Sequence, residues 1–232
     1  MKKYFSFIIS SFIILMFSSS AFAQSQTKNY DYKDFTKVEA GWGMELKITQ
    51  SDNYSIEVKA DEKDFEYLKV EKDGSSLKFY IDKDSYRKRS DINITIKMPS
   101  LTGLELSGGA EANIDMNISS KEFECGLSGG AELNGKLKCG DISIGSSGGG
   151  TTRLSGSGNN LKIDGSGGSQ FKLKNFSVKD VNSELSGGSE LTVTMNGNLS
   201  ASQSGGSKIV YYGKANSVDS HSSGGSSVSK GD

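Results

Sequence analysis

Acidic side chains recur at fixed positions beside a repeated tetrapeptide, Ser-Gly-Gly-x, which occurs seven times between Ser107 and Ser226. Four residues after each serine stand Glu111, Glu132, Thr151, Gln170, Glu190, Lys208 and Ser227. Two residues before it stand Glu105, Gly126, Gly145, Asp164, Glu184, Ser202 and His221. Ladders of this kind could bind cations or the hydroxyl groups of a glycan. The alternative, which we favour, is a solvated face that keeps the protein soluble, because the Gly-Gly-x-Gly-x-Asp spacing of calcium-binding solenoids is absent.

Catalysis has little support in the sequence. His221 is the only histidine and has no acid nearby except Asp219. The serines lack the strand-to-helix context of a nucleophile elbow, and the glycines lack the following helix of a phosphate loop. A polysaccharide lyase would need clustered acids with basic residues, but the only arginines are Arg87, Arg89 and Arg153. We therefore predict no enzyme, no catalytic residue, no cofactor and no metal site.

Two cysteines, Cys125 and Cys139, stand 14 residues apart on either side of one Ser-Gly-Gly turn. An exported protein permits a disulfide between them, across the interior of one repeat. Two buried free thiols are the alternative. A tetrahedral zinc site would need a second pair of ligands, which the sequence does not offer.

Aromatic side chains could stack on sugar rings. Near the N-terminal end the candidates are Trp42, Tyr30, Tyr32, Tyr54 and Tyr86. We favour the alternative in which these rings pack as a cap over the first repeat. In the adjacent pair Tyr211 and Tyr212, strand alternation predicts that Tyr212 points outward.

These candidate groups must be positioned by the repeats themselves. The spacings between successive serines are 21, 19, 19, 20, 18 and 19 residues, and apolar residues stand five and three positions before and five and seven positions after the serine. Shared parity places these positions on one face of two short strands. The pattern predicts an all-β fold, a parallel β-helix of about seven rungs, each rung being one coil of about 19 residues. Connection rules favour right-handed coiling.

The corner of each rung is predicted at Ser-Gly-Gly. Parity places the first glycine inward, and the second glycine can supply a positive φ. Toward the C-terminus, Ser183, Ala201 and Ser220 replace earlier aliphatic residues, so the last rung, residues 218–232, is predicted to be the least stable. An open edge there could pair with another chain.

Residues 1–23 are predicted to be a signal peptide, with Lys2 and Lys3 before an apolar stretch and Ala21-Phe22-Ala23 before the cleavage site. The alternative is a membrane anchor, but the apolar stretch is shorter than the roughly 20 residues that a span needs. No cysteine follows for a lipid anchor. We expect residues 24–232 to form one domain, with strands in 24–100 and the repeats in 101–232. Asp73-Gly74 predicts a hairpin turn.

The formal net charge of -1 gives no electrostatic reason to expect a nucleic-acid partner. The predicted signal peptide implies export to the periplasm, the outer cell surface or the medium. No stable transmembrane span is expected after its cleavage.

The mature chain resembles the putative auto-transporter adhesin, head GIN domain family of exported bacterial proteins. The resemblance rests on Gly41-Trp42-Gly43-Met44-Glu45-Leu46, on the strand ending at Met98-Pro99, and on Leu104-Glu105-Leu106-Ser107-Gly108-Gly109-Ala110 with its successors. It implies a β-helix-like fold and an envelope or extracellular location, and it brings no catalytic residues. We therefore expect an exported, non-enzymatic, adhesin-like binding module whose surface ligand is a glycan or an envelope protein. The alternative is a structural protein that self-associates through an open edge.

Overall fold

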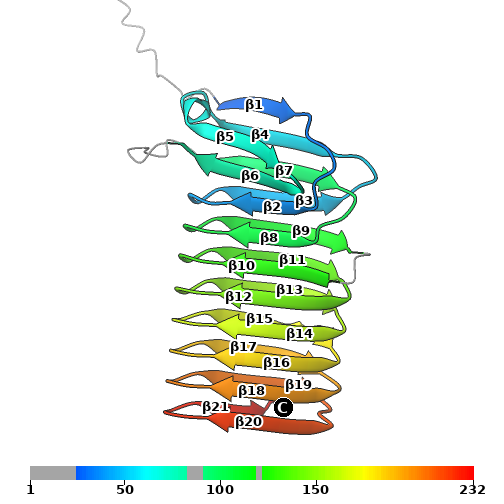
Figure 1. Cartoon of the computed structure of the whole chain (residues 1–232), viewed down its shortest axis with the longest axis vertical. Helices are drawn as coiled ribbons and strands as arrows, with labels where there is room; N and C mark the ends of the chain where they lie inside the picture. The colour runs from blue at the N-terminus through cyan, green and yellow to red at the C-terminus, as the bar shows by residue number, and fades with distance from the viewer. Residues whose placement is uncertain (1–24, 83–90, 119–121) are drawn as a thin grey trace, which may run out of the picture.

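The computed structural model describes residues 25–82, 91–118 and 122–232, which form a long stack of flattened rungs (Figure 1). The predicted signal peptide, residues 1–23, and Tyr86 lie outside the described residues. Each repeat supplies two strands, one on each side of its Ser-Gly-Gly corner. The repeat strands are β8 (Gly103–Leu106), β9 (Glu111–Asn117), β10 (Glu122–Leu127), β11 (Glu132–Lys138), β12 (Asp141–Ser146), β13 (Thr151–Ser157), β14 (Asn160–Gly165), β15 (Gln170–Val178), β16 (Asp180–Leu185), β17 (Glu190–Met195), β18 (Asn198–Gln203), β19 (Lys208–Gly213), β20 (Ser217–Ser222) and β21 (Ser227–Lys230).

The strands form two sheets that face each other. Sheet A has the order β1-β4-β7-β3-β9-β11-β13-β15-β17-β19-β21, and sheet B has the order β20-β18-β16-β14-β12-β10-β8-β2-β6-β5. From β8 onward every pairing is parallel and joins one repeat to the next, as in Glu122↔Asp141 and Glu132↔Thr151. The predicted β-solenoid of about seven rungs is therefore confirmed.

The N-terminal strands extend the same stack. β2 (Lys37–Ala40) and β3 (Glu45–Gln50) form one rung, and β6 (Ser76–Ile81) and β7 (Asn93–Met98) form another. The β2–β3 rung lies between the β6–β7 rung and the first repeat, so the order of rungs differs from the order of the chain. The antiparallel strands β1 (Ser25–Tyr30), β4 (Ser55–Asp61) and β5 (Leu68–Asp73) complete this end. The predicted turn at Asp73-Gly74 connects β5 to β6.

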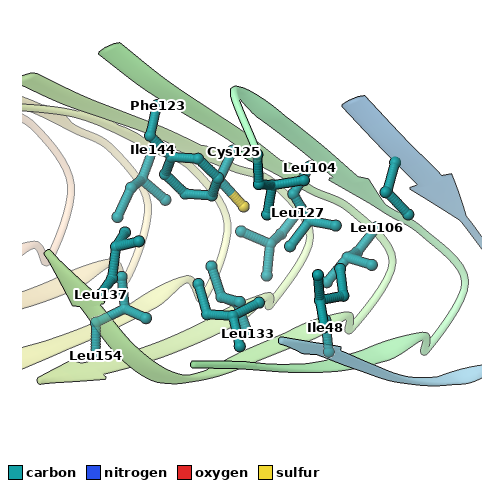
Figure 2. Packing of buried hydrophobic residues seen from close by; sticks show 14 of the residues in the cluster. Ile48, Leu104, Leu106, Phe123, Cys125, Leu127, Leu133, Leu137, Ile144 and Leu154 are labelled. Atoms are coloured by element: carbon teal, nitrogen blue, oxygen red, sulfur yellow. The ribbon is translucent and has the colours of Figure 1, made fainter. Parts of the chain in front are cut away.

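The core is a strip of side chains between the two sheets. The sequence columns reappear as stacked neighbours, for example Leu104, Cys125 and Ile144 in sheet B. Figure 2 shows residues of sheet B such as Phe123 and Leu127 pointing toward Leu133 of sheet A, and these three side chains are buried. Alternation of apolar and polar residues places one side of each strand in this strip and the other in solvent.

The corner glycines differ from the sequence prediction. The first glycine does not face inward: in the first repeat Ser107, Gly108 and Gly109 are all exposed, and burial resumes at Ala110. A turn closed by the Ala110 N–H, which donates to the Ser107 carbonyl at 3.0 Å, interrupts the strand alternation on which that prediction depended. The first glycine, and not consistently the second, takes the left-handed conformation, with φ between 54° and 73° in all seven corners.

The prediction of a thinning core is confirmed in its geometry. All six residues of β20 are exposed, and Val218 in that strand is 41% exposed. Small hydroxyl side chains replace apolar ones in the later rungs. Ser183, for example, is fully buried in the column in which Ile144 and Ile163 stand in the earlier rungs. Each such replacement buries less apolar area than the earlier aliphatics do.

Cys125 and Cys139 are free thiols. Both belong to the rung of β10 and β11, but Cys125 lies within β10, whereas Cys139 follows the end of β11 in the opposite sheet. The Cys125 side chain is buried among Leu104 and Ile144, its neighbours in the inner column. The structure therefore has the two thiols and not the disulfide.

Candidate functional site

Trp42 occupies a position that glycine holds in all seven repeats. The pairings Ala40↔Leu106 and Glu45↔Glu111 align Trp42 with Gly108. The backbone agrees, because φ is 58° at Trp42 and 54° at Gly108. The Gly43 N–H also donates to the Gly108 carbonyl at 2.9 Å, which fixes the two corners together. The chain therefore has an eighth corner of the same kind, built around a tryptophan.

A tryptophan at this corner is energetically unfavourable for the fold. The left-handed conformation costs an L-residue roughly 1–2 kcal/mol, and a bulky residue there is a backbone outlier. Burial of the indole recovers only part of this cost, because Trp42 remains 45% exposed. Strained residues of this kind are concentrated at functional sites. The indole is thus displayed at the surface in a place where folding alone would favour glycine.

A surface cavity of about 340 Å³ lies beside the indole. We call it the corner pocket and define it by its lining: the outward side chains Glu39 of β2, Lys78 and Tyr80 of β6, and Glu105 of β8, together with Trp42 and neighbouring corner residues. The outward residues reach the pocket because strand alternation places them on the solvent face of sheet B. Adjacent rungs bring these side chains together from distant parts of the sequence.

Two of the lining groups are already engaged by neighbouring side chains. The Lys78 ammonium lies 3.1 Å from Asp73 and 4.0 Å from Glu39. The hydrogen bond to Asp73, followed by the charge of Glu39, raises the pKa of Lys78. The Tyr80 hydroxyl donates to the Glu71 carboxylate. Lys78 and Tyr80 therefore form one wall of the pocket with fixed positions.

Glu105 differs from these groups, because no ion pair or hydrogen bond to another described residue holds its carboxylate. Its side chain lies over Gly126 of the next rung, in the space where any Cβ would collide with it. Partial burial raises the pKa of Glu105, and the negative charges of Glu39 and Glu124 raise it further, against a smaller opposite effect of Lys37. Lys37 is itself directed to Glu124, at 3.9 Å. The pocket thus contains an incompletely neutralised carboxylate beside an exposed indole.

This arrangement suits a ligand with both a flat apolar surface and hydrogen-bond donors. An indole face packs against such a surface and attracts positive charge through its π-system. Carboxylates accept hydrogen bonds from hydroxyl or ammonium groups. The two groups together can therefore offer stacking and hydrogen-bond acceptance to one ligand.

The other aromatic candidates pack within the N-terminal end. Tyr30 and Tyr32 stack at 6.5 Å, and Tyr54 lies 4.8 Å from the ring of Phe35 and donates to the Phe35 carbonyl. These three rings behave as the predicted cap, and Trp42 is the exception. Farther along, Tyr211 packs against the core, while Tyr212 points outward beneath the ammonium of Lys174, at 3.9 Å from the ring centroid.

The two polar columns form ladders on the outer faces of the sheets, as their parity predicts. Two of their carboxylates form ion pairs with basic side chains outside the columns: Arg153 lies 2.8 Å from Glu132, and Lys162 lies 3.2 Å from Asp164. His221 is exposed, with Asp219 at 3.9 Å. Among the residues with described positions, no three acidic, histidine or cysteine side chains are grouped so as to hold a metal ion.

Sequence reasoning singled out Trp42 but did not recognise its position as an eighth corner. The available signal was the pattern Gly41-x-Gly43 followed at the usual distance by an alternating strand. It was missed because neither the serine nor the first glycine of the repeat motif is present.

The fold is a β-solenoid with one corner that displays a tryptophan at the surface. The chain belongs to the family described as putative auto-transporter adhesin, head GIN domain, whose model matches residues 34–215. The family expectation from the sequence is thereby confirmed. No functionally curated protein matches the sequence. None of the described helices is long and apolar enough to cross a membrane.

Several solved structures have a similar fold. A putative adhesin from Bacteroides fragilis is 20% identical, with a TM-score of 0.83 over 89% of this chain and 97% of that chain. A putative adhesin from Parabacteroides merdae is 18% identical, with a TM-score of 0.71 over 90% and 97%. A putative lipid binding protein from Parabacteroides distasonis is 19% identical, with a TM-score of 0.68 over 90% and 97%. At these identities the likeness establishes a shared fold.

Proposed function

We propose that this protein is an exported, non-enzymatic binding module of the adhesin type, and that it binds a surface glycan through the corner pocket. The observation that carries the proposal is Trp42, a strained and exposed tryptophan at a corner that is otherwise glycine. The family description supports an adhesin-like role. The predicted signal peptide in residues 1–23 supports delivery to the periplasm, the cell surface or the medium.

A glycan fits the pocket better than other classes of ligand. A sugar ring presents a flat face of C–H groups to the indole and a rim of hydroxyl donors to Glu39 and Glu105. A nucleic acid would be repelled by these carboxylates, since the one lysine in the lining is held by Asp73.

The test is a glycan array followed by affinity electrophoresis in polysaccharide gels. The mature chain is compared with Trp42→Gly, which restores the residue found at the other corners. The variant should bind no glycan. Its free energy of unfolding should stay within about 1 kcal/mol of the parent, because relief of backbone strain offsets the lost indole contacts.

The matched control is Tyr212→Ala, which removes an outward aromatic residue far from the pocket. It should bind as the parent does. No glycan bound by the parent above a heat-denatured control, or full binding by a folded Trp42→Gly variant, would exclude the proposal.

Self-association is a second candidate function, favoured by the geometry of the last rung. Within the described residues, β20 and β21 each pair on one side alone, and Val218 is exposed beside that edge. Unpaired strand edges are templates for pairing with another chain. Light scattering coupled to size exclusion tests this role. Concentration-dependent dimers that Ser220→Pro abolishes would support it, whereas a monomer at high concentration would exclude it.

A further inference from the structure

We propose that the glycan recognised by the corner pocket carries free amino groups, and that a protonated amine binds between the Trp42 indole and the Glu105 carboxylate. This inference rests on the proposed glycan-binding function and adds the chemical class of the sugar. It goes beyond that function because a neutral sugar would need the indole but not the charge.

The first argument is the charge of the pocket. Its lining contains two carboxylates, Glu39 and Glu105, and one ammonium, Lys78. Lys78 also faces Asp73, so its positive charge is shared between two acids. Glu71 lies on the same side and holds Tyr80, and Lys37 is directed to Glu124. The groups that surround the pocket therefore leave a net negative charge, to which Glu105 contributes.

The second argument is the state of Glu105 itself. Partial burial and the nearby acids disfavour its charged form, as its raised pKa records. No described residue donates a hydrogen bond to it or pairs with it. A bound ammonium would supply both the missing donor and the missing charge, in a charge-assisted hydrogen bond. A neutral hydroxyl would supply only the donor.

The third argument is the indole. An exposed tryptophan that lines the same cavity offers a second, independent attraction for a cation. Carboxylate and indole together form a site for an ammonium group attached to a flat ring. A sugar carrying a carboxylate would be repelled by Glu39 and Glu105.

The experiment uses three oligosaccharides that share one β-1,4-linked backbone and differ only at the second carbon of each sugar. They carry a hydroxyl group (glucose units), an acetamido group (N-acetylglucosamine units) or a free amine (glucosamine units). Calorimetry with the mature chain at low salt and at a pH where the amine is protonated should show at least tenfold tighter binding of the glucosamine series. Added salt should reduce this preference.

The decisive variant is Glu105→Gln, which keeps the shape and removes the charge. It should reduce the preference for glucosamine over glucose units by about tenfold, the equivalent of 1.4 kcal/mol. Glu184→Gln is the matched control, because Glu184 stands in the same outer column of sheet B but outside the corner pocket. It should retain the parent preference. Circular dichroism confirms that both variants are folded.

Equal affinity for glucosamine and glucose units, or an unchanged preference in a folded Glu105→Gln variant, would overturn the amine inference and leave the glycan proposal standing. If none of the three oligosaccharides binds, the amine inference is also overturned. The wider glycan array then tests the proposed function separately. A preference that persists in Trp42→Gly would show that the charge attracts the amine without the indole, which contradicts the site as stated.

Discussion

Trp42 and Gly108 are neighbours in the stack and share one backbone conformation, with φ of 58° and 54°. The ideal Cβ position of Gly108 lies 3.3 Å from the Trp42 nitrogen, so the two corners are stacked closely backbone on backbone. The backbone at Trp42 is strained, because a residue with a side chain there has a left-handed φ. The backbone therefore takes the same conformation at Trp42 as at the glycine of the next corner.

Gly167→Val should destabilise the middle of the stack by about 1–3 kcal/mol. Gly167 has a φ of +73°, and an added Cβ would lie 3.2 Å from the Gly148 nitrogen. The cause is backbone strain at a corner, and not overpacking of the core. Gly168→Ala is the control, because its Cβ would meet nothing within 4 Å and its φ is not in the left-handed region. Urea unfolding should separate the two variants; equal midpoints would show that the corner register is incorrect.

Asp180→Ala should lose stability at neutral pH but not in acid. The Asn198 N–H donates to the Asp180 carboxylate at 2.7 Å, and this bond is the main reason why the pKa of Asp180 lies below its ordinary value of 3.8. A depressed folded-state pKa stabilises the fold above the ordinary value and ceases to do so as the pH falls through the depressed one. Melting temperatures of parent and variant should therefore converge as the pH falls below the ordinary value and through the depressed one. Asp52→Asn, in an exposed loop, is the control; a difference independent of pH would contradict the assignment.

The two thiols should react slowly and in a fixed order. Burial raises the pKa of Cys139 to about 11, and it raises that of the fully buried Cys125 further. Since the thiolate is the reactive form, native protein treated with iodoacetamide at pH 8 should be labelled at Cys139 before Cys125. Mass spectrometry of peptides measures both rates. Unlabelled cysteines after denaturation without reductant would instead reveal a disulfide.

Amide hydrogen exchange should be fastest in β20 and β21 among the repeat strands. These strands bury little apolar surface, whereas β10 to β15 enclose Phe123, Leu133 and Phe171. Local opening therefore costs less free energy in the last rung. Exchange by mass spectrometry resolves the rungs. Protection in β20 equal to that in β12 would contradict this expectation.

The inner columns of the repeats could be predicted from the sequence because alternate residues of each strand point into the core. Leu104, Cys125 and Ile144 were aligned by counting from the serines, and they are stacked neighbours in sheet B. The same counting failed at Gly108, because a turn breaks the alternation that made counting valid. Counting alternate residues predicts which side chains are buried within a strand, but it does not predict burial beyond a corner.

The rest of the candidate site depended on contacts that no local pattern encodes. Glu39, Lys78 and Glu105 come from three strands whose adjacency follows from the insertion of β2 between β6 and β8. The raised pKa of Glu105 likewise depends on Glu124, one rung farther along. Trp42 itself was identifiable as a candidate, but its strain became visible only once it was aligned with glycines.

The insertion of β2 between β6 and β8 also dictates the sequence of events in folding. Repeat strands meet partners about 19 residues away, whereas β2 must wait for β8, and the Thr36 carbonyl is bonded by Thr102 across 66 residues. Closing that long loop costs more chain entropy than pairing two neighbouring rungs, so we expect it to form more slowly. A chain that folds from its N-terminus would first complete this group of early strands. It would then add one rung at a time, each new rung using the previous one as its template.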